Sequence, residues 1–330
     1  RRIAPSSCET EPMDGSTAGG CTDPWRLGPS DRDQPAGRVL PLVLGTYLED
    51  FREAEPAVRS DGDPEDLHRF RVSLRRARSL MAVGSDVLPS EELVLLQALA
   101  SWFANVTSPV RDLDVLLVDL DDLGRSVVPE LHDALDELRV AVAAQRADAF
   151  DALVAELDGD RYPVLLRRWQ AMTAVVRVGG SDPGPDARRP MGEVSDQLIW
   201  SSYRRLRRRG RRAMSTDDLD AWHDLRKAIK RFRYLVAAFA PMYPDSAFEQ
   251  VPRRLADLQD TLGRLQDHHV QAAWIETIGV SAGGRAALAA GVVANTLHER
   301  SDRAHDHCRE AWSEFDRPKL RRRLRVLLTA

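Results

Sequence analysis

The sequence predicts an all-α fold made of two related halves, and three observations lead to this prediction. Apolar residues recur at helical spacing along most of the chain, and the alternation typical of β-strands is absent. A basic segment that starts at His68 has a counterpart that starts at His223, 155 residues later. An aspartate follows each histidine after 44 residues, Asp112 in the first copy and Asp267 in the second. Because self-similarity at a long period indicates a duplicated unit, we expect two pseudo-twofold-related helical bundles forming one domain with a basic groove.

The sequence divides into a linker and one domain. Residues 1–34 are rich in Ser, Thr, Gly, Pro and Asp and contain almost no periodic apolar residues, so they predict a disordered linker. Residues 35–330 then form one domain, with a first half over about 35–178 and a second half over about 190–330. The densest interior cluster of glycine and proline, residues 179–186, falls between the two copies and predicts the linker between the halves.

Start signals place the helices of the first half. Asp63 and Pro64, followed by two acids, have the composition of an N-cap and a first helical turn, so a basic helix begins there. Ser90, Ser108 and Pro129 begin three further helices, the last of which continues to about residue 157. Two more helices are expected, one over about 38–57 and one over about 162–177.

The second half repeats this order. Thr216, Asp217 and Asp218 form a capped, acidic first turn of the second basic helix, which stops before Pro241 and Pro244. The remaining helices are expected over about 191–212, 246–262, 266–278 and 284–314, with Gly263 as the break between the second and third of these and a last basic helix after them.

The two basic segments have the same pattern of charge. In each, a histidine is followed by cations at positions +3, +7 and +10, and these four positions fall within a sector of about 80° on a helix. Apolar residues such as Phe70 and Phe232 occupy the neighbouring sector, which faces the core in an amphipathic helix. Each helix therefore presents one cationic stripe beside its packed side. The first stripe consists of His68, Arg71, Arg75 and Arg78, and the second of His223, Arg226, Lys230 and Arg233.

The charge distribution indicates a focused site for an anion. The net charge is −4, yet the segment from Leu67 to Arg78 contains five arginines and no acid. A helix face in contact with solvent normally mixes charges of both signs. Arginine also suits phosphate, because its planar guanidinium forms two parallel hydrogen bonds to phosphate oxygens. We interpret the stripes as phosphate-binding surfaces, and the alternative is a solvated charged face.

At these residues the sequence resembles the CHAD domain family. The segments LHRFRVSLRRARSL and WHDLRKAIKRFRYL are similar to its two signature helices, and SPVRDLDVLL and LQDTLGRLQDHHV are similar to its two later motifs. The first copy departs from the family pattern at Val106–Pro109, where a Leu-Gly is usual. The resemblance covers the chain from about Pro35 onward. It implies an all-helical domain that binds inorganic polyphosphate, often beside a CYTH domain in the same polypeptide.

The stripes and the resemblance together define a candidate site. His68 and His223 head the stripes, where each either gains a proton with the bound anion or stays neutral in a hydrogen bond between helices. Asp112 and Asp267 are predicted to support the site by pairing with a stripe arginine. The predicted polyphosphate-binding residues are His68, Arg71, Arg75, Arg78, His223, Arg226, Lys230 and Arg233, with Arg76, Arg204, Arg208 and Arg231 in secondary positions.

The sequence predicts binding without catalysis. It contains no phosphate-binding glycine loop, nucleophile elbow or zinc-protease motif, and we expect no catalytic residue, metal or cofactor. Cys8, Cys21 and Cys308 form neither a disulfide framework nor a zinc motif, which favours a cytoplasmic protein, and no apolar run reaches the length of a membrane span. Two alternatives stay open. One is a single-stranded nucleic-acid binding module, which the aromatic content of 6% argues against. The other is an accessory domain of a triphosphate-hydrolysing enzyme, whose chemistry an upstream CYTH-type domain supplies.

Overall fold

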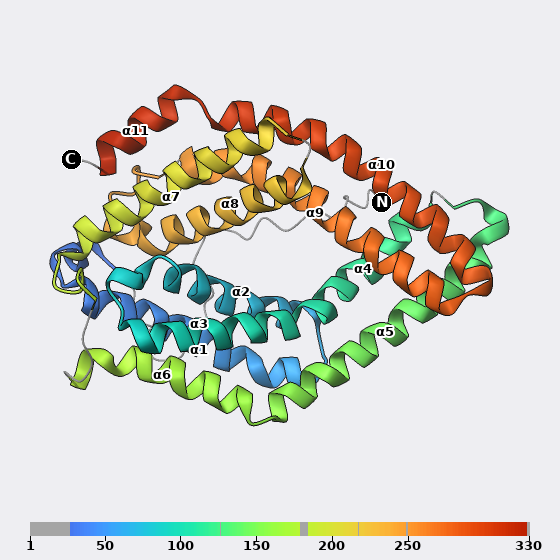
Figure 1. The fold of residues 1–330 in the computed structure, drawn as a ribbon, viewed down its shortest axis with the longest axis horizontal. Coiled ribbons are helices and arrows are strands. Elements are labelled where there is room, and N and C mark those ends of the chain that lie inside the picture. Colours follow the sequence, from blue (N-terminus) through green and yellow to red (C-terminus); the bar gives the residue numbers. More distant parts are fainter. Residues whose placement is uncertain (1–26, 126, 179–183, 217, 249, 329–330) are drawn as a thin grey trace.

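The fold is all-α, as the sequence predicts. We describe it from a computed structural model, which covers residues 27–125, 127–178, 184–216, 218–248 and 250–328. Within these ranges the chain forms helices and no strand, and one isolated bridge joins Pro35 to Pro190 (Figure 1). That bridge brings together the residues just before the first helices of the two halves, so the halves begin side by side.

The order of the helices repeats between the halves. α1 and α7 begin 155 residues apart, and so do α2 and α8, which is the offset that the sequence predicts. The two-fold axis itself stays a prediction. The first half contains α1 (Ala36–Arg59), α2 (Pro64–Met81), α3 (Ser90–Val106), α4 (Ser108–Gly124), α5 (His132–Asp158) and α6 (Arg161–Val178). The second half contains α7 (Met191–Met214), α8 (Leu219–Phe239), α9 (Gln250–Ala282), α10 (Gly284–Phe315) and α11 (Pro318–Leu328).

Both basic helices begin with the same capping chemistry. The side chain of Asp63 accepts a hydrogen bond from the backbone N–H of Glu65 (2.8 Å), and Asp218 accepts one from Asp220 (3.0 Å). Each bond satisfies a backbone donor that has no partner inside the helix. The caps therefore fix where α2 and α8 start, and with that the angular position of every residue on the two stripes.

The predicted break at Gly263 is wrong. α9 continues from Gln250 to Ala282 through this glycine, which is buried. Glycine inside a helix costs about 1 kcal/mol relative to alanine, and tertiary packing overrides a preference of that size. Ser108 holds the corresponding place in the first half, and Pro109 after it opens α4 as a separate helix. A proline lacks the backbone N–H that a continuous helix needs, so only the first copy is broken there.

The domain begins before Pro35. Residues 1–26 of the predicted linker lie outside the described residues, but Pro29–Asp33 forms a 3₁₀-helix. Arg32 on this helix pairs with Asp196 of α7 (2.9 Å) and lies 4.6 Å from the ring centroid of Tyr243. An ion pair and a ring contact to the second half hold this segment, so its composition was a poor guide to its structure. Residues 179–183 of the linker between the halves are also outside the described residues.

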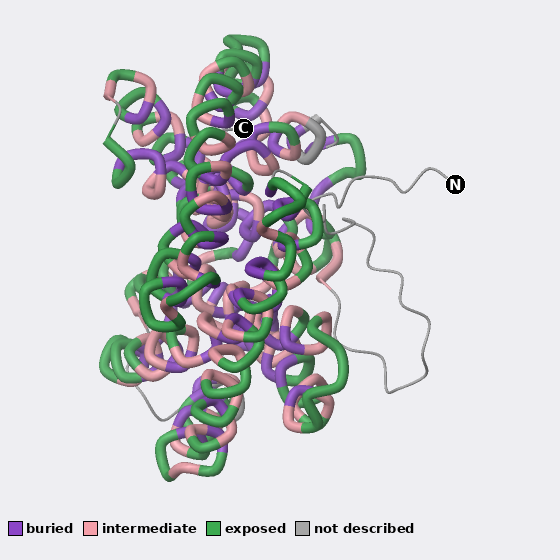
Figure 2. The backbone as a smooth tube through the Cα atoms, turned by 90° about the vertical axis from the view of Figure 1, so that its right-hand side faces the viewer, coloured by how far each residue is buried: buried purple, intermediate pink, exposed green. Residues whose placement is uncertain are grey.

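Two apolar cores organise the helices, and neither belongs to one half. The main core contains the stacked rings of Phe51 and Phe70 (3.9 Å between centroids) and, from the second half, Phe232 and Trp312. We call the smaller one the distal core. It is formed by α4 and α5 of the first half with α9 and α10 of the second, at the end where these four helices converge in Figure 1. Figure 2 shows that the buried segments face the inside of the molecule and the exposed ones its outer faces.

Helices α3 and α4 taken together, Ser90–Gly124, are long and apolar enough to cross a membrane by length and composition alone. Their buried side chains have a place in the fold. Leu96 and Phe103 lie in the main core, and Leu116 and Leu120 lie in the distal core. Packing within the domain therefore accounts for part of the apolar character of this segment, whereas Val94, Leu95 and Val118 are exposed.

We expect Gly210→Ala to destabilise the domain by about 1–3 kcal/mol, the usual effect of overfilling a core. A β-carbon at this buried position of α7 would lie 1.9 Å from the indole of Trp312, which is itself buried. Gly291→Ala on α10 is the matched control, because a β-carbon there meets nothing within 4 Å. The control should be neutral or slightly stabilising. Urea unfolding of both variants tests this expectation, and equal stabilities would show that the Gly210–Trp312 contact does not constrain the fold.

Candidate anion-binding site

Helices α2 and α8 lie next to one another in the middle of the molecule (Figure 1). Their apolar sides face away from each other. Phe70 stacks on Phe51 of α1, and Phe232 packs on Tyr203 of α7 with 5.7 Å between the ring centroids. Their charged sides meet, because the guanidinium of Arg75 on α2 lies 5.7 Å from the ring centroid of Tyr234 on α8. The two predicted stripes are therefore brought together, and all eight of their residues are partly buried.

Arg71 and Arg226 hold corresponding places and anchor neighbouring helices. Nη1 of Arg71 donates to the hydroxyls of Thr107 (2.7 Å) and Ser108 (3.2 Å) at the start of α4. Burial lowers the pKa of Arg71 to about 10. Arg226 donates to the carbonyl of Leu262 (3.1 Å) and pairs with Asp267 on α9 (3.3 Å). Both guanidiniums are thus largely committed to the protein, which leaves less of them for a ligand.

Asp112 and Asp267 lie beside the stripes, one on α4 and one on α9. Asp267 has the pairing with a stripe arginine that the sequence predicts. Asp112 has no ion pair with a described residue, although the positive charges of Arg71 and Lys230 act to lower its pKa. Burial raises its pKa, and the negative charge of Asp267 raises it further. The influence of Asp267 on Asp112 and the contacts between α4 and α9 indicate that the two carboxylates lie near each other.

The centre of the site is formed by Arg75 and Lys230, which are 155 residues apart and so correspond in the two halves. Nε of Arg75 is buried without a hydrogen-bond partner. Lys230 makes no hydrogen bond and no ion pair with any described residue. Burial lowers the pKa of Lys230 well below its usual range, and the charges of Arg226 and Arg75 lower it further. Two partly buried cations, one from each half, therefore lie close enough to influence each other, and neither forms an ion pair with a described carboxylate.

Arg78 and Arg233, the last cations of the two stripes, also contact neighbouring side chains. Arg78 donates to the hydroxyl of Ser101 (3.2 Å), and burial lowers its pKa. The guanidinium of Arg233 lies 5.1 Å from the ring of Tyr234, on the helix that carries both residues. Tyr234 thus contacts one cation of each stripe, Arg75 and Arg233. Its ring is buried, with 4% of its surface exposed, so it serves the cations and is closed to a ligand.

His223, at the start of the second stripe, forms a hydrogen bond between helices, which is one of the two roles that the sequence analysis considers for it. Nδ1 of His223 lies 2.7 Å from Oε1 of Gln266, so the residue forms a hydrogen bond between α8 and α9. Both side chains line a cavity of about 30 Å³, which also touches Trp222 and Arg226. This volume has room for a single water molecule. His68 heads the other stripe and is partly buried on α2.

The four secondary arginines lie outside the central pair. The positive charge of Arg76 partly offsets the rise that burial causes in the pKa values of Tyr47 and Asp50 on α1. Arg76 therefore lies on the side of α2 that faces α1. Arg231 is partly buried beside Arg205 of α7, and burial lowers its pKa. Arg204 and Arg208 are exposed on α7. No hydrogen bond or ion pair joins Arg204, Arg208 or Arg231 to Arg75 or Lys230 among the described residues, and the part of all four arginines in binding stays a prediction.

Several partners of the stripes were not predicted from the sequence. The hydroxyls of Ser101, Thr107 and Ser108 and the amide of Gln266 are all of this kind. One signal was available, because Thr107 and Ser108 stand where the family usually has Leu-Gly. That departure supplies the two hydroxyls that hold Arg71.

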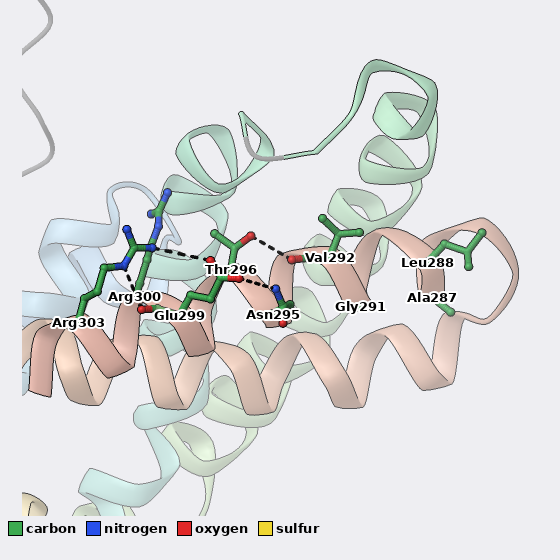
Figure 3. A pocket seen from close by; sticks show the side chains of 9 residues that line it. All are labelled: Ala287, Leu288, Gly291, Val292, Asn295, Thr296, Glu299, Arg300 and Arg303. Atoms are coloured by element: carbon green, nitrogen blue, oxygen red, sulfur yellow. Dashed lines mark hydrogen bonds and ion pairs between the residues drawn. The ribbon is translucent and has the colours of Figure 1, made fainter.

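A separate depression of about 830 Å³ lies along α10, on the distal end of the molecule (Figure 3). All its lining residues come from this one helix, including Leu288, Asn295 and Arg303. Arg300 on its rim pairs with Asp122 of α4 (2.8 Å), so its charge is already neutralised. Polar groups from several elements do not converge here, in contrast to the site between α2 and α8.

Comparisons with known proteins give the same picture of the fold. The crystal structure of the CHAD domain from the plant Ricinus communis covers 96% of this chain and 98% of its own, with 25% identity and a TM-score of 0.72. PptA from Streptomyces chartreusis is 17% identical, covers 85% of this chain and 100% of its own, and has a TM-score of 0.68. At that identity the second comparison supports the fold alone.

Two curated relatives are longer than this chain. Uncharacterized proteins from two strains of Mycobacterium tuberculosis are each 25% identical over 311 residues, which is 90% of this chain and 56% of theirs. The chain therefore spans about half the length of the curated relatives it matches. The model of the CHAD domain family matches residues 42–276, which include both basic helices and both of the aspartates beneath them. With the duplicated helices, their packing and this match in agreement, the chain belongs to the CHAD domain family.

Proposed function

We propose that the domain binds linear inorganic polyphosphate between α2 and α8 and does not alter it chemically. The observation that supports this most directly is the pair formed by Arg75 and Lys230. Each half contributes one of these partly buried cations, and neither has a carboxylate within ion-pair distance among the described residues. Burying like charges together is unfavourable, and a bound anion relieves that cost.

The chemistry of the stripes fits a polymer of phosphates. Successive phosphates of a linear chain can each accept hydrogen bonds from one cation, and the outer residues Arg78 and Arg233 extend the row on either side of the central pair. Polyphosphate presents no base or sugar, and the site presents no exposed aromatic ring to read one, since Tyr234 is buried. These features favour polyphosphate over single-stranded nucleic acid as the ligand.

We also propose that any phosphate chemistry belongs to another part of the parent protein. Within the described ranges no three His, Cys, Asp or Glu side chains are arranged to hold a metal ion, which phosphoryl transfer generally uses. The curated relatives are nearly twice as long as the matched segment, which leaves room for a second domain such as the CYTH type. In this proposal the chain is an accessory binding module that acts in the cytoplasm.

Titration with long-chain polyphosphate and with single-stranded RNA of equal total charge tests the proposal. We expect polyphosphate to bind more tightly and its affinity to fall steeply between about 50 and about 500 mM salt, because each neutralised charge releases counterions. A flat salt profile contradicts an electrostatic site, and equal affinity for RNA favours the nucleic-acid alternative. Release of inorganic phosphate from the polymer by the purified chain contradicts the non-catalytic part of the proposal.

A further inference from the structure

The central pair is chemically unequal. Arg75 and Lys230 correspond in the two halves, but only Arg75 lies over an aromatic ring, that of Tyr234. The residue that corresponds to Tyr234 in the first half is Ser79, whose hydroxyl donates to the carbonyl of Arg75 (2.8 Å). No ring contact to Lys230 occurs among the described residues. One half therefore offers a supported arginine, and the other an unsupported lysine.

The charges that act on Lys230 come from four helices, α2, α4, α8 and α9. α2 contributes Arg75, and α8 itself contributes Arg226 and Arg233. The negative charges come from Asp267 on α9 and Asp112 on α4. Asp267 is already paired with Arg226, and Asp112 lies in the field of Arg71. Lys230 thus has three cationic neighbours, and of the two neighbouring acids Asp267 is paired with Arg226, whereas Asp112 forms no ion pair with a described residue.

Lysine and arginine respond differently to such surroundings. A guanidinium keeps its proton under nearly all conditions, whereas a buried ammonium among like charges readily loses its proton. We propose that Lys230 is the proton-accepting cation of the site: it takes up a proton when a phosphate occupies the centre, while Arg75 is charged throughout. This inference rests on the proposed function. In the binding step, one proton from solvent joins the lone pair of Nζ, and the resulting ammonium donates to a phosphate oxygen.

The direction of the pH effect follows from the proton balance. The bound phosphate favours the ammonium, so the pKa of Lys230 is higher in the complex than in the free domain, where burial depresses it. Between these two values the complex holds more protons than its separate components. Affinity for polyphosphate therefore falls as the pH rises through this window, and below it the titration of Lys230 no longer changes the affinity, because Lys230 is charged in both states.

The test measures proton uptake directly. Isothermal titration calorimetry with long-chain polyphosphate, in two buffers of different ionisation enthalpy at each pH from about 7 to about 10, gives the number of protons bound with the ligand. We expect the unmodified chain to take up close to one proton more than Lys230→Arg at the maximum. Proton exchange by the polymer and by the rest of the site is common to both proteins, so it cancels in the difference.

Two further variants keep the test decisive. Lys230→Met retains much of the side-chain volume without a charge, and it should bind at all pH values as weakly as the unmodified chain does at high pH. The exchange of Arg75→Lys with Lys230→Arg preserves the composition of the site but places the lysine over Tyr234, which favours its charged form, so this variant should take up fewer protons than the unmodified chain. Equal proton uptake by the unmodified chain and Lys230→Arg overturns the role of Lys230. Absence of polyphosphate binding at every pH instead overturns the proposed function.

Discussion

Removing the cations from either stripe will lower the affinity for long polyphosphate by about 100-fold, although the other stripe is left intact. The two variants are Arg75→Gln with Arg78→Gln on α2, and Lys230→Gln with Arg233→Gln on α8. Since α2 and α8 are in contact, one polymer reaches both stripes, and each half raises the effective concentration of the ligand for the other. Arg71 and Arg226 are left in place, because their bonds to Ser108 and Leu262 maintain the fold.

The measurement is a titration that yields both affinity and stoichiometry, after circular dichroism has confirmed the helical content. Arg167→Gln with Arg168→Gln on α6 is the charge-matched control, since both residues are exposed and neither lies on a stripe. This control should bind within a few-fold of the unmodified chain. Two separate binding faces would give a different result: each stripe variant would halve the stoichiometry, and the remaining sites would keep their full affinity.

The largest loss of stability is expected from Arg146→Met on α5. Arg146 donates from Nε to Asp114 on α4 (2.9 Å) and pairs with Asp61, in the turn before α2. The side chain of Asp114 is only 4% exposed, so removing the arginine leaves a buried carboxylate without its counter-ion. We expect the free energy of unfolding to fall by about 3 kcal/mol, the lower end for a broken buried pair, because Arg146 is itself 17% exposed.

The loss should depend on pH in a defined direction. Burial raises the pKa of Asp114 above its ordinary value, and without Arg146 it rises further. The folded variant then binds a proton that the unfolded chain has released, so its stability falls as the pH rises between these two pKa values. The deficit is full at about pH 7 and shrinks toward about pH 4, where Asp114 is protonated in the folded variant.

Urea unfolding at these two pH values checks the prediction for Arg146. Arg125→Met is the control, because its pair with Asp122 is exposed (75% and 52%) and such pairs contribute at most about 1 kcal/mol. A similar small loss in both variants would mean that Asp114 finds another partner. A pH-independent loss in Arg146→Met would mean that the effect comes from the packing of its stem on Phe150 and not from the charge of Asp114.

Local chemistry was sufficient to predict where most helices begin and which side of α2 and α8 is basic. The cap of Asp63 and the prolines and serines at helix starts act within one turn, so their effect can be read from neighbouring residues. The continuity of α9 could not be read this way. Gly263 indicates only a weak local preference against a helix, and the packing that overrides this preference comes from residues distant in the sequence.

The roles of individual stripe residues depend on such distant contacts as well. The sequence places Arg71 and Arg75 on one stripe with equal standing. In the fold, Arg71 is held by Thr107 and Ser108, whereas Arg75 meets Tyr234, 159 residues away. Periodicity predicts which face of a helix is charged, but it contains no information about which charges the neighbouring helices will neutralise. The division into anchoring and uncompensated cations therefore required the tertiary structure.

The distal core has a consequence for how such a duplicated chain can exist at all. Its apolar residues come in equal measure from helices of both repeats, for instance Leu116 and Leu138 from the first and Ile275 and Val293 from the second. A polypeptide with one repeat alone would expose the apolar faces of its two distal helices to water. It could bury them only by packing against a second copy of itself. Neither half can therefore bury its share of the distal core by itself, and the covalent link between the halves keeps the two shares together at any protein concentration.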